Sequence, residues 1–208
     1  MGRIHLPSIC MITDDSSCES DQGLLDRISK SVRGGVNMVH LRNSKKSSSE
    51  LYYLALQIRS ITLDKALFFV NDRVDIAIAS DADGVQLKES SFSVQDTRKI
   101  WGDRLMIGRS IHSLESAIQS QNEGADFLLG GTVFKSETHK DVEPNGLHFL
   151  TSLKDKIDIP IIAIGGITED NVGDCIKSGA NGVAMIRSFS NSKDPEKVAR
   201  NFHRLLNN

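Results

Sequence analysis

Short apolar runs alternate along the chain with longer segments in which apolar positions recur at helical spacing. Eight of these runs are continuous rather than alternating, as is typical of strands that are covered on both faces. We predict strands at residues 9–13, 38–41, 67–70, 84–87, 106–108, 127–129, 161–164 and 182–186. Helices are predicted between them at residues 21–32, 48–61, 94–101, 113–123, 147–156, 169–177 and 195–206.

Local signals mark several boundaries of these elements. Ser113 is placed to cap a helix that Gly124 can end in a left-handed conformation, and Asp194-Pro195 opens the last helix. The regular strand–helix units leave an open doubly wound sheet or a closed barrel. No Gly-x-Gly-x-x-Gly follows the first strand and no reversal of strand order is evident, so we predict a single α/β domain, a (β/α)₈ barrel over residues 1–208.

Composition narrows the class of protein. Lys and Arg number 25 against 27 Asp and Glu, a balance that argues against a nucleic-acid partner. Cys10, Cys18 and Cys175 form no Cys-x-x-Cys pair, which is typical of reduced thiols, and no apolar stretch approaches the roughly 18 residues of a membrane span. We expect a cytoplasmic protein without a membrane partner that acts on a small molecule; a homo-oligomer stays open.

The most informative motif is Ile164-Gly165-Gly166-Ile167, followed by Thr168, which we expect to open a helix. Two glycines let the backbone approach an anion, and the loops after strands seven and eight of this fold often bind phosphate. The neighbouring strand ends at Ile186-Arg187-Ser188. We predict a phosphate site formed by Gly165, Gly166, Ile186 and Arg187, the alternative being a tight turn beside a surface arginine.

Other polar residues stand at the ends of strands two and three. Arg42 can bind a carboxylate or a second phosphate through two hydrogen bonds, and Asn71 can bind a heterocycle edge or cap a turn. Asp72 is expected to pair with Arg73 or to cap the next helix, because a single carboxylate is a poor magnesium site.

Histidines near the predicted mouth are candidates for proton transfer. His40 ends a strand beside Arg42, while His112 and His139 fall in loops on the same side. Imidazole titrates near neutral pH and so serves as a general acid or base, although a single histidine is more often structural.

The motifs at consecutive strand ends resemble, in order, those of the thiamine phosphate synthase/TenI superfamily. They cover nearly the whole chain and read Ile12-Thr13-Asp14-Asp15, His40-Leu41-Arg42, Asn71-Asp72-Arg73, Gly84-Val85-Gln86-Leu87, Ile107-Gly108-Arg109-Ser110-Ile111-His112-Ser113, Gly131-Thr132-Val133-Phe134 and Ala163-Ile164-Gly165-Gly166-Ile167. The resemblance implies the (β/α)₈ barrel.

One arm of that superfamily, thiamine phosphate synthase, couples a pyrimidine pyrophosphate to thiazole phosphate with Mg²⁺. Its Gln-x-Arg-x-Lys run reads His40-Leu41-Arg42-Asn43-Ser44 here, and its second metal aspartate falls on Ser91. Its Thr-x-Thr-Lys loop reads Ser136-Glu137-Thr138-His139. A pyrophosphate leaving group needs its charge neutralised, so these differences argue against the synthase. Asp72 is a metal ligand only under that interpretation.

The other arm, the TenI-type thiazole tautomerase, is similar in its His-x-Arg run and in Val85-Gln86-Leu87 ahead of Ser91-Phe92-Ser93. The reaction implied is the cofactor-free aromatisation of a carboxythiazole phosphate. The catalytic histidine of that arm falls on Thr132, which has no useful basicity. We therefore predict a tautomerase-type isomerase in which His40, or else His139, transfers the proton.

The resemblance also places Ser110, Ser136 and Thr138 beside Arg42 and Asn71 as substrate-binding residues. Two alternatives stay open. One is a magnesium-dependent thiamine phosphate synthase, and the other is a regulatory protein that binds a thiazole phosphate or thiamine phosphate without turning it over.

Overall fold

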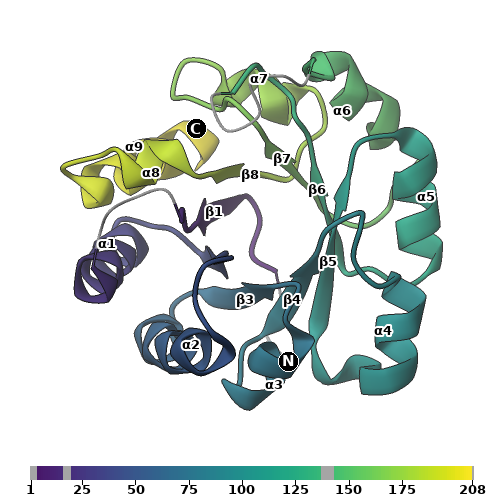
Figure 1. Ribbon diagram of the computed structural model, residues 1–208. Coiled ribbons are helices and arrows are strands. Elements are labelled where there is room, and N and C mark those ends of the chain that lie inside the picture. Colours follow the sequence, from purple (N-terminus) through teal and green to yellow (C-terminus); the bar gives the residue numbers. More distant parts are fainter. Residues whose placement is uncertain (1–3, 16–19, 137–142, 208) are drawn as a thin grey trace.

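The chain forms a closed parallel barrel of eight strands in sequential order, each neighbouring the next and β8 pairing with β1. This computed structural model describes residues 4–15, 20–136 and 143–207. Figure 1 shows the helices arranged around the strands. The strands are β1 (Ser8–Ile12), β2 (Met38–Leu41), β3 (Leu67–Asn71), β4 (Gly84–Leu87), β5 (Met106–Ile111), β6 (Phe127–Gly130), β7 (Ile161–Ile164) and β8 (Gly182–Met185).

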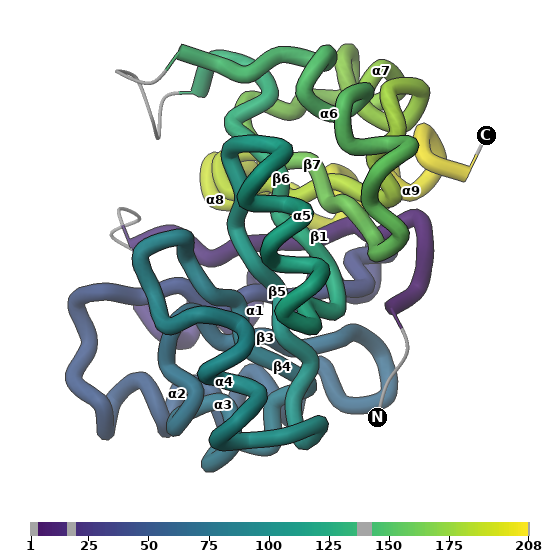
Figure 2. Tube along the Cα trace, turned by 90° about the vertical axis from the view of Figure 1, so that its right-hand side faces the viewer, coloured from purple at the N-terminus to yellow at the C-terminus, as the bar shows by residue number. Residues whose placement is uncertain are grey.

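The outer helices follow the predicted segments with small shifts at their ends. They are α1 (Asp21–Arg33), α2 (Ser48–Thr62), α3 (Val74–Ala79), α4 (Val94–Trp101), α5 (Leu114–Asn122), α6 (Gly146–Lys154), α7 (Val172–Lys177), α8 (Arg187–Ser190) and α9 (Pro195–Asn207), with a 3₁₀ turn at Gly102–Arg104. Figure 2 shows α4, α5 and α6 lying in front of the strands. None of the helices in the described segments is long and apolar enough to span a membrane.

The capping predictions are confirmed. The Ser113 side chain accepts a hydrogen bond from the Ser116 backbone N–H, and Gly124 has a φ of 92°. Asp194 accepts the Lys197 N–H at the start of α9. These contacts satisfy backbone groups that a helix end leaves without an internal partner.

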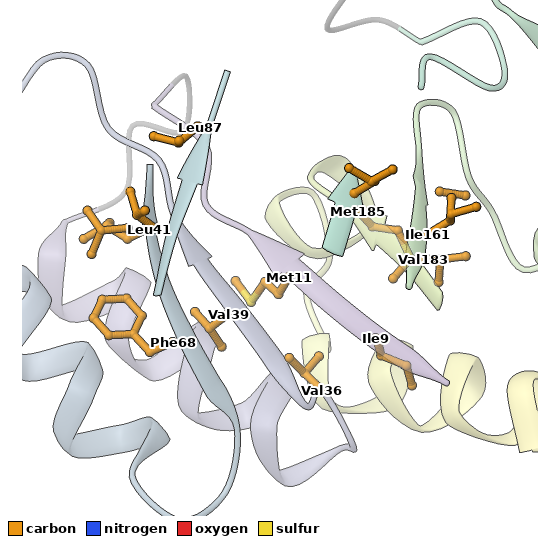
Figure 3. Packing of buried hydrophobic residues seen from close by; sticks show 14 of the residues in the cluster. Ile9, Met11, Val36, Val39, Leu41, Phe68, Leu87, Ile161, Val183 and Met185 are labelled. Atoms are coloured by element: carbon orange, nitrogen blue, oxygen red, sulfur yellow. The ribbon is translucent and has the colours of Figure 1, made fainter. Parts of the chain in front are cut away.

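Two apolar layers stabilise the barrel, because successive side chains of a strand point to opposite faces. Cys10 and Ile12 belong to a cluster inside the barrel with Phe69 and Phe127, whose rings meet edge to face at 5.0 Å. Ile9 and Met11, the alternate residues of the same strand, belong to the larger cluster that the outer helices join. Figure 3 shows members of that larger cluster on β1, β2, β7 and β8.

Two predicted boundaries are wrong, and α3 and α8 lie outside the helical ranges given above. The fifth strand runs to Ile111 rather than ending at residue 108, and the helix after the Gly-Gly turn begins at Val172 rather than at Thr168. In the last case Asn171 closes a turn of its own: its side-chain oxygen accepts the Thr168 N–H, and its amide donates to the Gly166 carbonyl. Side-chain bonds of this kind compete with helix formation.

Candidate functional site

A cavity of about 580 Å³ opens at the carboxyl ends of the strands, where this fold places its binding sites. Its apolar wall is made by Ile12, Leu129, Ile164, Ala184 and Ile186, which continue the inner cluster of the barrel upward. Polar residues surround that wall. The combination is typical of small-molecule sites, in which a few polar groups orient a ligand that is otherwise held by apolar contacts.

Most of the residues predicted from the sequence come together in this one cavity. Those that line it are His40, Arg42, Asn71, Ser110, Thr132, Ser136, Gly165, Gly166, Ile186 and Arg187. Thr138 and His139 lie outside the described residues. The shared location agrees with the predicted site, while the role of each residue stays a prediction.

The Gly165-Gly166 turn is required first of all by packing within the protein. Both residues have positive φ, 104° and 62°, and a Cβ on Gly166 would lie 2.5 Å from the Lys135 carbonyl oxygen. The loop after β6 crosses here, with the Val133 and Phe134 N–H groups donating to the carbonyls of Ile164 and Gly165 at 2.9 and 3.0 Å. The glycines therefore serve a close approach of two backbones.

A backbone donor nevertheless remains at this turn. The Gly166 N–H has no hydrogen-bond partner among the described residues. Because α7 begins only at Val172, no helix dipole points at the turn, contrary to our expectation. The adjacent loop does supply polar groups, since Arg187 and Ser188 line the cavity at the start of the short helix α8.

His40 is the buried polar residue at the other side of the cavity. Its side chain ends β2, is 4% exposed, and its Nε2 has no hydrogen-bond partner in the described structure. Burial and the charge of Arg42 lower the pKa of His40 to about 3, and a hydrogen bond to Asn71 opposes that shift. His40 is therefore neutral near pH 7.

Asn71 indicates which nitrogen of His40 carries the proton. Its Nδ2 donates to Asp72 at 2.7 Å, so its oxygen is left to accept from the ring of His40. Since the ring interacts with the Asn71 oxygen and Nε2 has no partner, we assign the proton to Nδ1, which leaves a lone pair on the buried Nε2.

Arg42 is positioned by the neighbouring strand end. The Thr13 hydroxyl accepts the Arg42 N–H at 2.8 Å and donates to the Arg42 carbonyl at 2.9 Å, which ties the two loops together. The guanidinium lies close enough to His40 to lower the pKa of that imidazole by its charge.

The partners predicted for Asp72 are wrong. Arg73 instead forms a bidentate pair with Asp75, and Asp72 pairs with the Lys88 ammonium at 2.7 Å. The left-handed backbone at Asp72, with φ of 58°, turns its carboxylate toward β4. Burial raises the pKa of Asp72, but hydrogen bonds from Lys88 and Ser91 outweigh it and hold that pKa below its usual value.

Magnesium does not fit the carboxylate of Asp72. Its two oxygens accept the Asn71 amide, the Lys88 ammonium, the Lys88 backbone N–H and the Ser91 hydroxyl. A carboxylate has about four lone-pair positions, so none is left for a metal ion. The described segments also hold no group of three or more His, Cys, Asp or Glu side chains arranged for a metal.

Three further charged residues line the cavity that we did not predict: Lys88, Glu89 and Lys135. Glu89 contacts the ring of His112 at 2.9 Å. Burial raises the pKa of Glu89, but its hydrogen bonds to His112 and Ser116 outweigh that effect and hold the pKa below its usual value. With Arg42 and Arg187, the described part of the lining holds four cationic side chains and one carboxylate, a balance that favours an anionic ligand.

Lys88 and Glu89 directly follow the predicted fourth strand, so they stand at a polar strand end, but we assigned neither residue a role. Lys135 lies in the long loop after β6, where no periodicity indicates which side chains face the cavity. Both lysines were missed because spacing along the chain does not reveal where a flexible side chain turns.

Comparisons with known proteins identify relatives over nearly the whole length of this chain. A putative thiamine-phosphate synthase 2 of Aquifex aeolicus is 39% identical over 187 residues, which is 89% of this chain and 99% of that protein. A thiamine-phosphate synthase of Chlorobium luteolum is 36% identical and covers all of this chain and 96% of its own.

Solved structures with a similar fold include a member of the same family. The thiamine phosphate pyrophosphorylase of Pyrococcus furiosus superposes with a TM-score of 0.88 at 32% identity, over 96% of this chain and 95% of that one. A 3-hexulose-6-phosphate synthase, with a TM-score of 0.76 at 15% identity, shares the fold alone. The sequence profile of the family described as thiamine monophosphate synthase matches residues 9–189, and the chain belongs to that family.

Proposed function

We propose that this protein binds a carboxythiazole phosphate and aromatises it by proton transfer without a divalent metal. The observation that carries the proposal is the neutral, buried His40, which lines the same cavity as the loops after β7 and β8 and whose buried Nε2 has no hydrogen-bond partner in the described structure. The proposal keeps to the thiamine biosynthesis family and differs from the names of the relatives in the reaction.

The lining of the cavity supports a ligand with an apolar ring and two anionic ends. The phosphate meets the Gly166 N–H and the loop at Arg187 and Ser188, and the ring contacts the apolar wall. Arg42 is placed to bind the carboxylate, because a guanidinium matches a carboxylate through two parallel hydrogen bonds.

In this arrangement His40 removes a proton from the ring carbon and returns it to the exocyclic carbon. A base works best when its pKa lies near the working pH, whereas burial, together with the charge of Arg42, lowers the pKa of His40 to about 3. An anionic ligand corrects part of this difference: it offsets the charges of Arg42 and Lys88, both of which lower that pKa. This offset acts only on the smaller, charge-based part of the shift, because burial is its largest cause.

Thr132 cannot take over the proton, because its hydroxyl is not basic near pH 7. It is 7% exposed and packs against Gly165, between the two sides of the cavity. We assign it contact with the ligand ring, where its hydroxyl orients the ring or a water molecule.

The test is aromatisation of the carboxythiazole phosphate tautomer, followed in the presence of EDTA. His40→Asn should lower kcat by about 10²–10⁴-fold, the range typical of a general base, while phosphate affinity is unchanged. Thr132→His should raise turnover. The matched control is His148→Asn, which changes an exposed histidine on α6 and should leave turnover intact.

If His40→Asn turns over like the unchanged protein, His40 is not the base, and His139 is the next residue to replace. If only Thr132→His turns over, the protein is a binder without chemistry of its own, which is the regulatory alternative.

A second candidate function is the coupling reaction of thiamine phosphate synthase. The observation that favours it is the naming of relatives 34–39% identical over 86–100% of this chain as thiamine-phosphate synthases, one of them putatively. Four cationic side chains around the cavity also suit a pyrophosphate. Magnesium-dependent formation of thiamine phosphate would identify this reaction. The cytoplasmic location and the single-domain organisation over residues 1–208 stay predictions.

A further inference from the structure

We propose that Lys88 is a built-in replacement for a divalent cation: its ammonium fills the cation position beside Asp72 and keeps metal ions out of the cavity. The inference concerns metal binding alone. It therefore stands or falls separately from the reaction proposed above.

The first argument is the saturation of the Asp72 carboxylate. One oxygen accepts the Lys88 backbone N–H at 3.1 Å and the Ser91 hydroxyl. The other accepts the Asn71 amide at 2.7 Å and the Lys88 ammonium at 2.7 Å. A metal ion would have to displace one of these donors, and three of the four come from residues 88 and 91 in the β4–α4 loop.

The second argument is where Lys88 lies. Its side chain is 56% exposed and lines the cavity, while Asp72 is 26% exposed and sits beneath it. The ammonium thus neutralises the carboxylate on one side and faces the ligand on the other. It is also near enough to His40 to lower the pKa of that residue by its charge.

The third argument is charge. A divalent ion on one carboxylate leaves a surplus of one positive charge for the ligand, whereas Lys88 on Asp72 leaves none. The positive charge that a ligand meets comes instead from other cationic residues of the lining, such as Arg42 and Lys135. Inorganic phosphate should therefore bind without metal, and pyrophosphate should gain nothing from added metal.

The arrangement also shows which substitutions should allow Asp72 to bind a divalent metal ion. Lys88→Ala frees one lone-pair position on one carboxylate oxygen of Asp72, and Ser91→Asp removes the hydroxyl donor from the other oxygen while adding a second carboxylate. Magnesium and manganese accept oxygen ligands from one or two carboxylates, and affinity rises with the charge of the ligands.

The experiment is a titration of each folded protein with Mn²⁺, in which the free ion is measured by electron paramagnetic resonance. The unchanged protein should bind no Mn²⁺ in the cavity, Lys88→Ala should bind it weakly, and Lys88→Ala/Ser91→Asp should bind it about tenfold more tightly than the single variant, as expected from the added ligand charge.

Lys177→Ala is the matched control. It removes another lysine that pairs with an aspartate, Asp174 at 3.6 Å on α7, and should leave Mn²⁺ binding as it is in the unchanged protein. Circular dichroism checks that each variant is folded; should the double variant not fold, Lys88→Ala alone decides, because its side chain is largely exposed.

Two results would overturn the inference. One is Mn²⁺ binding by the unchanged protein that Asp72→Asn abolishes, which would mean that the metal displaces Lys88. The other is a folded Lys88→Ala protein, alone or with Ser91→Asp, that binds no more Mn²⁺ than the unchanged protein.

Discussion

The two sides of the cavity recognise charge by different means. At β7 and β8, a glycine turn is held by contacts with the loop after β6 and leaves the Gly166 N–H directed to no partner among the described residues. At β2 to β4, a network of side chains joins His40, Asn71, Asp72 and Lys88. The first side is built from backbone and tolerates few changes; the second is built from exchangeable side chains, where members of one family can differ in chemistry.

The largest effect is expected at the backbone side. In Gly166→Ala the new Cβ lies 2.5 Å from the Lys135 carbonyl oxygen, and the alanine backbone must adopt a positive φ. The strain and the clash together should lower the free energy of unfolding by about 2–4 kcal/mol. Urea denaturation measures the change.

The matched control for that variant is Gly124→Ala, where φ is also positive, 92°, but the atoms nearest to the new Cβ lie at an ordinary contact distance of 3.8 Å or more. This control should lower the free energy of unfolding only through the strained backbone conformation, by about 1 kcal/mol. Equal losses in the two variants would show that the packing of the Gly-Gly turn against the β6 loop contributes nothing.

A somewhat smaller effect is expected for the arginine that completes the backbone side. Arg187→Gln removes a charged donor and should weaken thiazole phosphate binding by about 10–100-fold, the range of a charge-assisted hydrogen bond. Isothermal titration calorimetry measures the affinity. Arg200→Gln, which breaks an ion pair with Glu196 on the outer helix α9, should leave affinity unchanged. If both variants bind alike, the phosphate lies elsewhere.

The smallest effect is expected at the side of β2 to β4, where the pH dependence of stability reports on His40. Because the pKa of His40 falls from 6.5 to about 3 on folding, the unfolded chain binds the extra proton between these values, and stability falls as pH is lowered through that window. His40→Asn should remove a slope of about 1.4 kcal/mol per pH unit between pH 6 and 4. Urea denaturation across this range, with His148→Asn as control, gives the slope; an unchanged slope would mean that His40 titrates normally in the folded protein.

The difference between the two sides of the cavity also explains which features could be predicted from the sequence. The barrel followed from eight apolar runs, and the Gly-Gly turn and Arg187 followed from their places at strand ends. Asp72 was assigned the wrong partner because its left-handed backbone turns the carboxylate toward β4, and a positive φ at an aspartate has no marker in the sequence. Lys88 was missed for the same reason, since its role exists only through that contact.

The helix after the Gly-Gly turn was placed too early for a different reason. Thr168 and Glu169 carry ordinary helix-start signals, but the Asn171 side chain bonds both the Thr168 N–H and the Gly166 carbonyl. A local side-chain bond and a helix start compete for the same backbone groups, and composition alone does not decide between them.

The central claim is that this family member acts on one thiazole phosphate without a metal. The most direct measurement is product identification by mass spectrometry in two parallel reactions of the purified protein. One contains the carboxythiazole phosphate tautomer with EDTA, and the other contains pyrimidine pyrophosphate and thiazole phosphate with Mg²⁺. The account predicts aromatised thiazole phosphate in the first reaction and no thiamine phosphate in the second; thiamine phosphate formed only with Mg²⁺, and no aromatisation in EDTA, would contradict it.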